Sequence, residues 1–479
     1  MLEFLFIPLA AVVIAPLFSP RAATIISAVS FLIPFAYILY CLFSGKVFEE
    51  MLIFVSKPIG NFYLLNDFIS YAFGLTICIV SAMVALYSLP YMRHRFEELG
   101  YHLEDEFRRY FFLYNLYAVS MLWLVFSGNL IMLYIFLELS LLASFLLIYL
   151  YGYGNRQWVA ILYFIWTHIA GLLALIGFLL IMFDNATAAL NQIKTVSFLA
   201  WLLIFAGMLI KLPGVGPHIW LPWAHAEAPT PVSALLSPLT VGLGAYILLR
   251  IYLLNPIYFK TFAPIILAYG VFSSIYAGLS VFRQTDYKRL LAYSTVSQMG
   301  YMLIGLALGT SGLIGVVIQY MSHAFGKSIL FMTAGGLIAL YHGLRDINKM
   351  GGLHEQVPSI SNAALIGFMN LSGILAIGMF GEFFILKGVT DVFGLDVKVL
   401  LSVVTVFIIS GLYSFYVLKK IFYGTPRKEY EKAKVHRFLD VPLYIIGILS
   451  MIFIFPPLIT SLLQGLKINL SLSLGGVIP

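Results

Sequence analysis

The stretch KLPGVGPHIWLPWAHAEAPTP, residues 211–231, interrupts an apolar run with a lysine and then with helix-breaking residues. Lys211 follows SFLAWLLIFAGMLI and is separated by one residue from PGVGP at 213–217. Proline lacks an amide donor and clashes with the preceding turn, so two prolines and two glycines within five positions predict an opened helix. Non-helical backbone at membrane depth persists only inside protein or beside water. We therefore predict a small hydrated break with Lys211 beside it.

The composition of the whole chain is that of an integral membrane protein. Its 479 residues are 61% hydrophobic and 10% charged, and the mean hydropathy is +0.97. Soluble domains contain about 25% charged residues, and a soluble chain of this composition would need a dry core larger than single domains build. The run FLFIPLAAVVIAPLFSP has no basic segment before it, which favours a first membrane helix over a cleaved signal.

No sequence motif assigns redox or nucleotide chemistry to this chain. Cys41 and Cys78 both lie in apolar runs and predict neither a disulfide framework nor a metal site. The sequence has no CxxC pair, Walker loop, haem-attachment motif or GxGxxG following a strand. We expect no cofactor in this chain.

The apolar stretches predict an all-α polytopic protein with about fourteen membrane-spanning helices in one bundle. A bilayer core requires about 20 apolar residues. Such stretches occupy about 2–19, 22–43, 64–89, 107–126, 129–151, 156–183, 196–221, 231–254, 263–282, 289–309, 312–341, 360–390, 396–422 and 441–463. The longest polar loops, 90–106 and 423–440, are expected to be solvated or to dock partners.

The loop charges predict the orientation in the membrane. Eighteen of the 28 Lys and Arg residues fall in loops on one side, seven on the other and three inside spans. Cytoplasmic loops carry the excess of basic residues. We therefore predict a protein of the cytoplasmic membrane with both termini outside, and this asymmetry explains the net charge of +7 better than nucleic-acid binding does.

Five ionisable residues fall inside predicted spans. Each charge at a helix centre costs about 2.5–3.5 kcal/mol on the insertion scale, so intramembrane ionisable residues are functional candidates. They are Glu138, Lys211, Lys327, Glu382 and Lys387.

We predict that Glu138 pairs with Lys211. Glu138 lies nine residues after Asn129, about 13 Å along a helix and therefore near the middle of the membrane. Burial favours the neutral form of a lysine, and a nearby carboxylate favours the charged form. Separating the two would release the proton. The alternatives are a structural ion pair for Glu138 and a Lys211 that reaches the membrane surface.

Histidines and a glutamine extend the candidate set. Gln319, His323 and Lys327 are spaced i, i+4 and i+8, which predicts one polar stripe on an apolar helix; a satisfied core histidine is the alternative. His168 is interpreted mainly as a packing residue. A secondary set after the first break comprises His218, His225 and Glu227. We expect His225 and Glu227 in a short loop, where they either gate a cytoplasmic entrance or are solvated.

A second break is predicted in NLSGILAIGMFGEFFILKGVTD. Gly378 and Gly381 precede Glu382, and Lys387 follows. Paired broken helices in corresponding halves indicate an inverted-repeat transporter. The predicted units are 1–106 with three N-terminal helices, 107–254 and 263–422 as five-helix repeats, and 441–463 as the last helix.

Four motifs resemble one known family over about residues 60–463. KLPGVGPHIWLPWAHAEAPTPVSALL, DYKRLLAYSTVSQMGYMLIG, SHAFGKSILFMTAGG and FGEFFILKG are similar to the antiporter-like subunits of respiratory complex I, of membrane-bound hydrogenases and of multisubunit (Mrp-type) Na+/H+ antiporters. The resemblance implies fourteen core helices, two inverted five-helix repeats, broken seventh and twelfth helices, and a hydrated charged axis along the membrane plane.

The resemblance also implies roles for single residues. Glu138 matches the glutamate of the fifth helix and Lys211 the lysine of the seventh. His323 and Lys327 match the central relay on the eleventh helix, and Glu382 the terminal residue on the twelfth.

This chain departs from the family pattern at its centre. The eighth helix of the family often carries a lysine or histidine, whereas Ser237 and Gly242 occupy the matching positions here. Gln298 stands where the family motif has a histidine. We expect no long lateral helix after residue 463, so that the chain resembles the shorter paralogues or their hydrogenase and antiporter relatives.

These patterns predict an H+- or Na+-translocating subunit of a redox-driven complex, such as a membrane-bound hydrogenase or an NADH or ferredoxin oxidoreductase. Expected partners are lipids, paralogous membrane subunits and peripheral subunits that carry iron–sulfur or other redox centres. Ions would be taken up from the cytoplasm near Lys211 or the eleventh-helix relay and released near Glu382. The alternatives are a subunit of a stand-alone Na+/H+ antiporter and a membrane scaffold whose relay has decayed.

Overall fold

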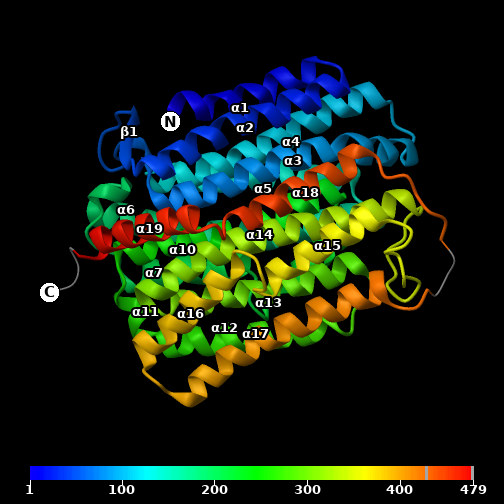
Figure 1. The fold of residues 1–479 in the computed structure, drawn as a ribbon. Coiled ribbons are helices and arrows are strands. Elements are labelled where there is room, and N and C mark those ends of the chain that lie inside the picture. Colours follow the sequence, from blue (N-terminus) through cyan, green and yellow to red (C-terminus); the bar gives the residue numbers. More distant parts are fainter. Residues whose placement is uncertain (427–429, 476–479) are drawn as a thin grey trace.

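Helices run side by side along one direction through the whole molecule (Figure 1). The computed structural model describes residues 1–426 and 430–475, and side chains up to residue 471. Within these residues nine helices are long and apolar enough to cross a membrane, or ten if one bent pair counts as a single span. The other predicted spans are helices that are short, broken or rich in polar residues. The predicted all-α membrane bundle is confirmed.

The elements follow the apolar stretches because backbone in a membrane must satisfy its hydrogen bonds internally. In chain order they are α1 Leu2–Ile14, α2 Pro20–Ser44, β1 Phe48–Ile53, β2 Phe62–Asn66, α3 Phe68–Glu98, α4 Leu103–Phe126, α5 Leu130–Tyr151, α6 Arg156–Asn185, α7 Phe198–Lys211, α8 Trp220–Glu227, α9 Thr230–Leu235, α10 Leu243–Leu254, α11 Ile257–Thr261, α12 Ala263–Val281, α13 Tyr287–Leu306, α14 Gly309–Leu340, α15 Pro358–Leu371, α16 Gly378–Phe393, α17 Val397–Leu418, α18 Arg437–Ile452 and α19 Pro456–Gly475.

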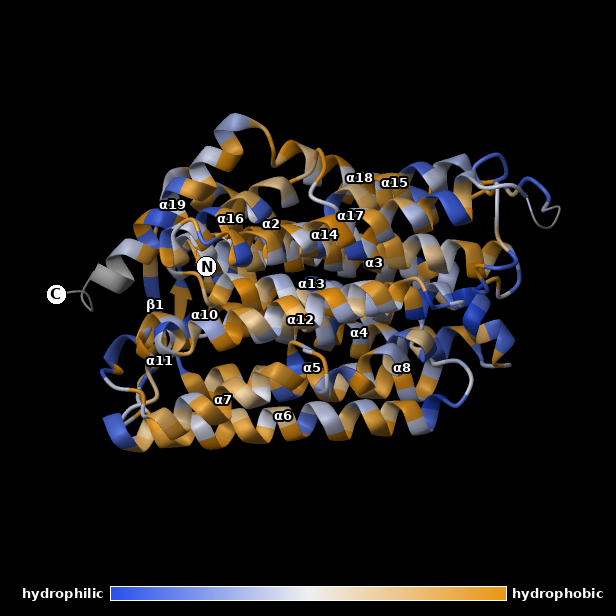
Figure 2. Cartoon of the chain, turned by 90° about the horizontal axis from the view of Figure 1, so that it is seen from below, coloured by the Kyte–Doolittle hydropathy of each residue, from blue (hydrophilic) through white to orange (hydrophobic). Residues whose placement is uncertain are grey.

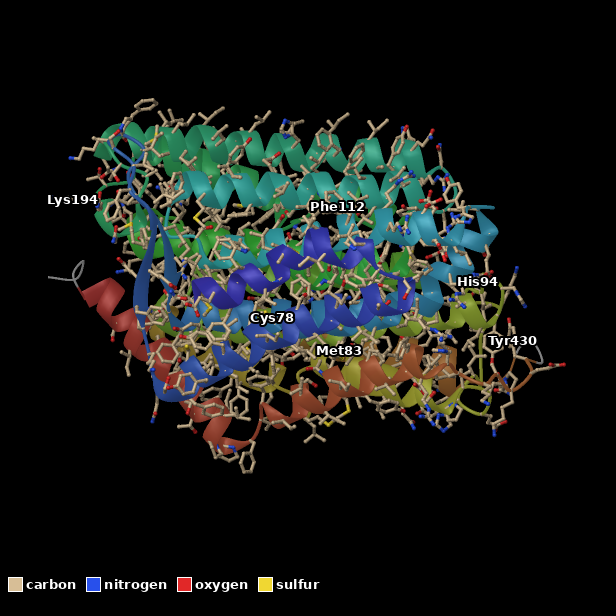
Figure 3. The ribbon with its side chains drawn as sticks, turned by 90° about the horizontal axis from the view of Figure 1, so that it is seen from above. Cys78, Met83, His94, Phe112, Lys194 and Tyr430 are labelled. Atoms are coloured by element: carbon tan, nitrogen blue, oxygen red, sulfur yellow. The ribbon has the colours of Figure 1, made fainter. Side chains whose placement is uncertain are left out.

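Hydrophobic residues extend along the length of the helices, and hydrophilic residues gather at the two ends of the bundle (Figure 2). Figure 3 places Lys194 at one end and His94 and Tyr430 at the other. The core surrounds α14, which packs on α3, α13, α15, α16 and α18. Cys41 and Cys78 are buried and unbonded.

Three local predictions were wrong. First, a two-stranded antiparallel hairpin, β1–β2, pairs Phe48 with Asn66 between α2 and α3. Second, the predicted loop 90–106 is mostly helix, since α3 continues to Glu98 and α4 starts at Leu103. The charged residues there form pairs within each helix, such as Arg95–Glu98 at 2.9 Å.

The third error concerns the last predicted span, 441–463. It is two helices, α18 and α19, that bend by 71° at the break before Pro456. Proline cannot continue the helical ladder, and this explains the bend. The predicted loop 423–440 ends where α18 begins at Arg437, and residues 427–429 lie outside the described residues.

Both predicted helix breaks are confirmed. The seventh span is α7, an irregular segment with a 3-10 turn at Pro217–Ile219, and α8. The twelfth is α15, an irregular segment 372–377, and α16. This second break lies earlier than predicted, because Gly378 and Gly381 are inside α16. The eighth span contains a π-helical turn at Leu236–Thr240, a feature that is common at functional sites.

Candidate functional site

Glu138 pairs with a histidine on the next helix. Its Oε2 lies 2.7 Å from Nδ1 of His168, which projects from α6. Gly171 makes room for this carboxylate, since a Cβ there would lie 1.9 Å from Oε1 of Glu138. His168 is therefore a hydrogen-bond partner of Glu138 rather than the packing residue that the sequence indicated. Both side chains are partly exposed at the edge of the bundle, where α5, α6 and α7 lie together (Figure 2).

Lys211 ends α7 with its amine buried and unpaired. The residue is 2% exposed, and Nζ has no hydrogen-bond partner in the described part of the chain. The predicted ion pair with Glu138 is not formed, because among the described side chains Glu138 lies within 4.0 Å of His168 instead. Oε1 of Glu138 is also buried without a partner, so each group retains a free bonding position.

Neighbouring side chains hold the first break open. Nε1 of Trp220 donates to the carbonyl of Ile210 at 3.1 Å, which the broken ladder leaves free. From α12, the hydroxyl of Tyr269 donates to the Val215 carbonyl at 2.8 Å, and Oγ of Ser273 accepts from the Val215 amide at 3.1 Å. The non-helical backbone is thus satisfied inside the protein.

His218 belongs to this support. It lies in the 3-10 turn, and its Nδ1 accepts from the amide of Gly216 at 3.1 Å. Its ring contacts Tyr276 and Tyr293 edge-on. His218 therefore helps to fix the backbone conformation of the break.

His225 and Glu227 lie in α8, so the predicted loop was wrong. The helix resumes at Trp220 and runs to Glu227, which leaves only residues 228 and 229 before α9. His225 is fully buried beside Phe331, and neither ring nitrogen has a hydrogen-bond partner among the described residues. Solvation is therefore excluded for His225.

Glu227 faces a polar cavity at the end of the bundle. The cavity has a volume of about 650 Å³, and its lining includes Glu227, Asp286, Arg345 and Lys349. Asp286 and Arg345 are ion-paired at 2.7 Å. Behind this cavity Lys288 is fully buried on α13, and its amine donates to the carbonyl of Ala228. The sequence placed Lys288 in a basic loop, just before the predicted span 289–309, because the apolar stretch begins only after the charged motif DYKR.

His323 and Lys327 lie at the centre of the bundle on α14, and both are fully buried. Lys327 donates to the carbonyl of Leu291 at 2.8 Å and to the hydroxyl of Ser294. Nε2 of His323 lies 3.3 Å from the carbonyl of Ser237, and Nδ1 has no partner among the described residues. These contacts are all to neutral groups, so only hydrogen bonds offset the free-energy cost of burying either charge.

The eighth span offers a backbone carbonyl at the position where the family resemblance implied a base. Ser237 belongs to the π-helical turn, where its carbonyl reaches His323 and its hydroxyl bonds Thr295 at 2.7 Å. Gly242 has no room for a side chain, since a Cβ would lie 2.4 Å from the ring of Tyr320.

Two glutamines continue the polar stripe towards the second break. Nε2 of Gln319 donates to Oε1 of Gln298 at 2.7 Å. Nε2 of Gln298 then donates to the hydroxyls of Ser410 and Tyr413 and to the carbonyl of Leu371, the last residue of α15. Amides replace the family histidine here and leave an unbroken chain of hydrogen bonds.

Glu382 lies in the second turn of α16, beside the second break. Its Oε1 is buried without a hydrogen-bond partner among the described residues. Gly373 faces it from the break with φ +65°, and a Cβ there would lie 2.4 Å from Oε2 of Glu382. Glycine is required for both the backbone angle and the space.

Lys387 is not a buried charge. Its side chain is 48% exposed and pairs with Asp391 at 2.7 Å, and Ser311 lies within hydrogen-bond distance of both. The sequence placed Lys387 inside the membrane because the predicted span 360–390 includes it. In the structure it lies near the end of α16 on the outer face of that helix.

Sequence reasoning also missed a buried ion pair at the other end of the eighth span. Arg250 donates two hydrogen bonds to Asp67, and both side chains are 4% exposed. Asp67 also caps α3 by accepting from the amide of Ser70 at 2.8 Å. The signal was present, since Asp67 directly precedes an apolar helix, as N-cap residues do. In the described residues no group of three or more His, Cys, Asp and Glu side chains is placed to hold a metal ion.

Comparison with known proteins now adds to this geometry. Residues 127–409 match the family model described as NADH:quinone oxidoreductase/Mrp antiporter, transmembrane. The chain is 34% identical over 323 residues to subunit M of the NADH-quinone oxidoreductase of Pseudomonas aeruginosa, covering 63% of this chain and 62% of that protein. It is 29% identical over 434 residues to a putative antiporter subunit, mnhA2, of Staphylococcus aureus, covering 83% of this chain and 53% of that one. The chain thus spans less than two thirds of the length of these relatives.

Solved structures share the fold over nearly all of the chain. A chain of the Mrp complex from Dietzia sp. aligns with TM-score 0.84 at 18% identity, covering 97% of this chain and 96% of that one. A chain of respiratory complex I from Thermus thermophilus aligns with TM-score 0.80 at 23% identity, covering 97% and 98%. The family match covers more than half of the chain, and it includes Glu138, Lys211, His323, Lys327 and Glu382. The chain therefore belongs to the family of antiporter-like membrane subunits that NADH:quinone oxidoreductases and Mrp antiporters share.

Proposed function

We propose that the chain translocates H+ or Na+ across the cytoplasmic membrane as an antiporter-like subunit of a complex I-like, redox-driven complex. The observation that carries the proposal is the buried, unpaired amine of Lys211 at a helix break, with Glu138 held by His168 nearby. The chain itself would catalyse no redox chemistry. Partner subunits would hold the iron–sulfur or other redox centres and supply the driving force.

The proposed switch moves Glu138 between two partners. When Glu138 pairs with His168, burial disfavours the charged form of Lys211, and the lysine gives up its proton. When Glu138 turns towards Lys211, the carboxylate stabilises the protonated amine, and the lysine takes up a proton. The free Oε1 of Glu138 supports this exchange, because it accepts no bond in the observed arrangement.

Uptake is proposed at the polar cavity beside Glu227. Lys288 lies behind it, and His225 of α8 is buried against Phe331 of α14, the helix that carries His323 and Lys327. Like charges this deeply buried repel, so only some of these bases carry a proton at one time. A proton that enters therefore displaces another towards the next site. The amides of Gln298 and Gln319 would orient water on the way to Glu382, where the ion is released.

The scheme includes two inverted repeats and one orientation in the membrane, both inferred from sequence patterns. The inverted repeats, 107–254 and 263–422, are supported by the two broken helices in corresponding places. The orientation with both termini outside is supported by the excess of basic residues in one set of loops. That orientation puts the cavity beside Glu227 in the cytoplasm.

A subunit of a stand-alone Na+/H+ antiporter is the second candidate. The observation that favours it is the alignment of the Staphylococcus aureus relative over 83% of this chain. Gentle purification of the native complex and identification of its subunits separates the candidates. Iron–sulfur proteins in the complex would exclude the pure antiporter.

Ion pumping by Lys211→Ala and Glu138→Gln tests the relay itself. Both substitutions are expected to reduce pumping by about 100-fold or more, the usual contribution of a positioned proton-transfer group. Lys194→Ala is the control, because Lys194 lies in an exposed connection at the end of the bundle (Figure 3). Unchanged pumping in both variants, with assembly intact, would leave the decayed scaffold as the function.

A further inference from the structure

A basic pocket lies where the start of α2 meets the start of α18. It has a volume of about 560 Å³, within the usual range of ligand sites. Figure 1 shows the turn before α2 and the chain leading into α18 at the same end of the bundle. Four basic side chains line it, and none of the described lining residues is acidic: Arg21, Lys434, His436 and Arg437.

The backbone adds to the positive character of this pocket. Arg21 is the second residue of α2, and Arg437 is the first residue of α18. The start of a helix carries a partial positive charge that attracts anions. Nδ1 of His436 accepts from the amide of Phe438 at 3.1 Å, so the proton of the neutral ring lies on Nε2 and can be donated.

An apolar groove adjoins the pocket. It lies between α1 and α2, has a volume of about 410 Å³, and is lined almost entirely by aliphatic residues. The groove extends from Ile14 and Ile25, near the turn between the helices, to Ile7 and Ile33 farther along them. Ile25 lines both cavities. The basic pocket and the apolar groove therefore adjoin at this side chain.

We infer that this composite cavity binds an anionic phospholipid, with the phosphate in the basic pocket and one acyl chain in the groove. The charge of the pocket selects an anionic head group. The shared wall at Ile25 selects an amphiphile, since a free phosphate would use the pocket alone. An acidic segment of a partner protein would likewise leave the groove between α1 and α2 unused.

Native mass spectrometry of the purified complex tests this inference. The complex is stripped with detergent and then offered phosphatidylglycerol, phosphatidylcholine or inorganic phosphate. We expect selective retention of phosphatidylglycerol. Arg21→Ala and Arg437→Ala should each weaken it about fivefold, the usual contribution of one basic residue beside an anionic lipid. Lys432→Ala is the matched control, because Lys432 is exposed nearby and does not line the pocket.

A second substitution tests the groove separately. Ile25→Trp places a larger side chain where the pocket and the groove meet and leaves all four basic residues intact. It should weaken binding of phosphatidylglycerol without changing the response to inorganic phosphate. Equal retention of the two lipids, or phosphatidylglycerol binding that Arg21→Ala and Arg437→Ala leave unchanged, would overturn the inference. So would full displacement of the lipid by inorganic phosphate, or an acidic protein segment that occupies the pocket. Thermal melting of every variant confirms that the fold is retained.

Discussion

The two helix breaks are alike in plan and opposite in charge. At the first, a lysine is left unpaired, and the carboxylate Glu138 is tied to His168 at the edge of the bundle. At the second, Oε1 of the carboxylate Glu382 is left without a hydrogen-bond partner among the described residues, and the cation Lys387 is paired with Asp391 on the outer face of its helix. Each break thus combines one ionisable group that has a buried, unbonded atom with a more exposed pair of polar side chains.

The unbonded group is a lysine at the first break and a carboxylate at the second, so the two breaks are expected to differ in how they handle a proton. A buried lysine without a partner releases a proton readily, whereas a buried carboxylate without a partner holds one. Under the proposed function, the first break therefore passes protons on, and the second retains them until release. Between the breaks the groups are bases and amides, with Lys327 and His323 held by neutral acceptors.

The largest effect is expected from Glu382→Gln, which keeps the shape of the side chain and removes its titration. We expect ion translocation to fall by about 100-fold or more, because Glu382 is the only acidic residue between Pro358 and Thr390, the stretch that contains the second break. Glu382→Asp should retain part of the activity. Glu355→Gln serves as control, since Glu355 is exposed in a connection. Translocation assays in proteoliposomes measure the effect, and full activity of Glu382→Gln would remove the second break from the mechanism.

Gly171→Ala should disturb the first break by steric means. Alanine normally stabilises a helix interior by about 0.5–1 kcal/mol relative to glycine, yet here its Cβ would lie 1.9 Å from Oε1 of Glu138. We expect a lower melting temperature and about tenfold slower translocation, because the added methyl group displaces the carboxylate from its position beside His168.

Gly411→Ala is the matched control for this substitution. Gly411 lies within α17, and a Cβ there meets no atom within 4 Å. The control should be neutral or slightly stabilising. If both alanine variants melt at the wild-type temperature and translocate normally, Gly171 does not position Glu138.

Sequence reasoning found the breaks and the unpaired groups for one physical reason. Proline and glycine act on the chain locally, and a charge in an apolar run is costly wherever the run folds. Lys211 and Glu382 were therefore visible without any knowledge of their neighbours.

The pairing of these groups could not be predicted in the same way. Whether Glu138 meets His168 or Lys211 depends on the rotation of α5 against α6 and α7, which no local pattern encodes. Lys288 was misplaced because helices can carry charges into a buried region that a hydropathy window excludes. The continuation of α8 was missed because Pro222 lies within its first turn, where proline is tolerated.

His168→Ala tests the contact between Glu138 and His168 at the first break. Removing the ring frees Glu138 to pair with Lys211, and the switch should then rest in its protonated arrangement. We expect about fivefold slower translocation, because Glu138 then no longer alternates between two partners. Rates measured in proteoliposomes test the expectation. Wild-type rates would show that His168 only packs against α5.

The smallest effect is expected at the peripheral pair of the second break. Lys387→Ala removes an ion pair whose two side chains are 48% and 42% exposed. Exposed pairs contribute about 0–1 kcal/mol, so the melting temperature should change little and translocation by less than about twofold. Asp391→Asn should behave in the same way. A large loss of translocation in either variant would give Lys387 and Asp391 a part in release from Glu382, and the edge pairs of the two breaks would then differ in function as well as in charge.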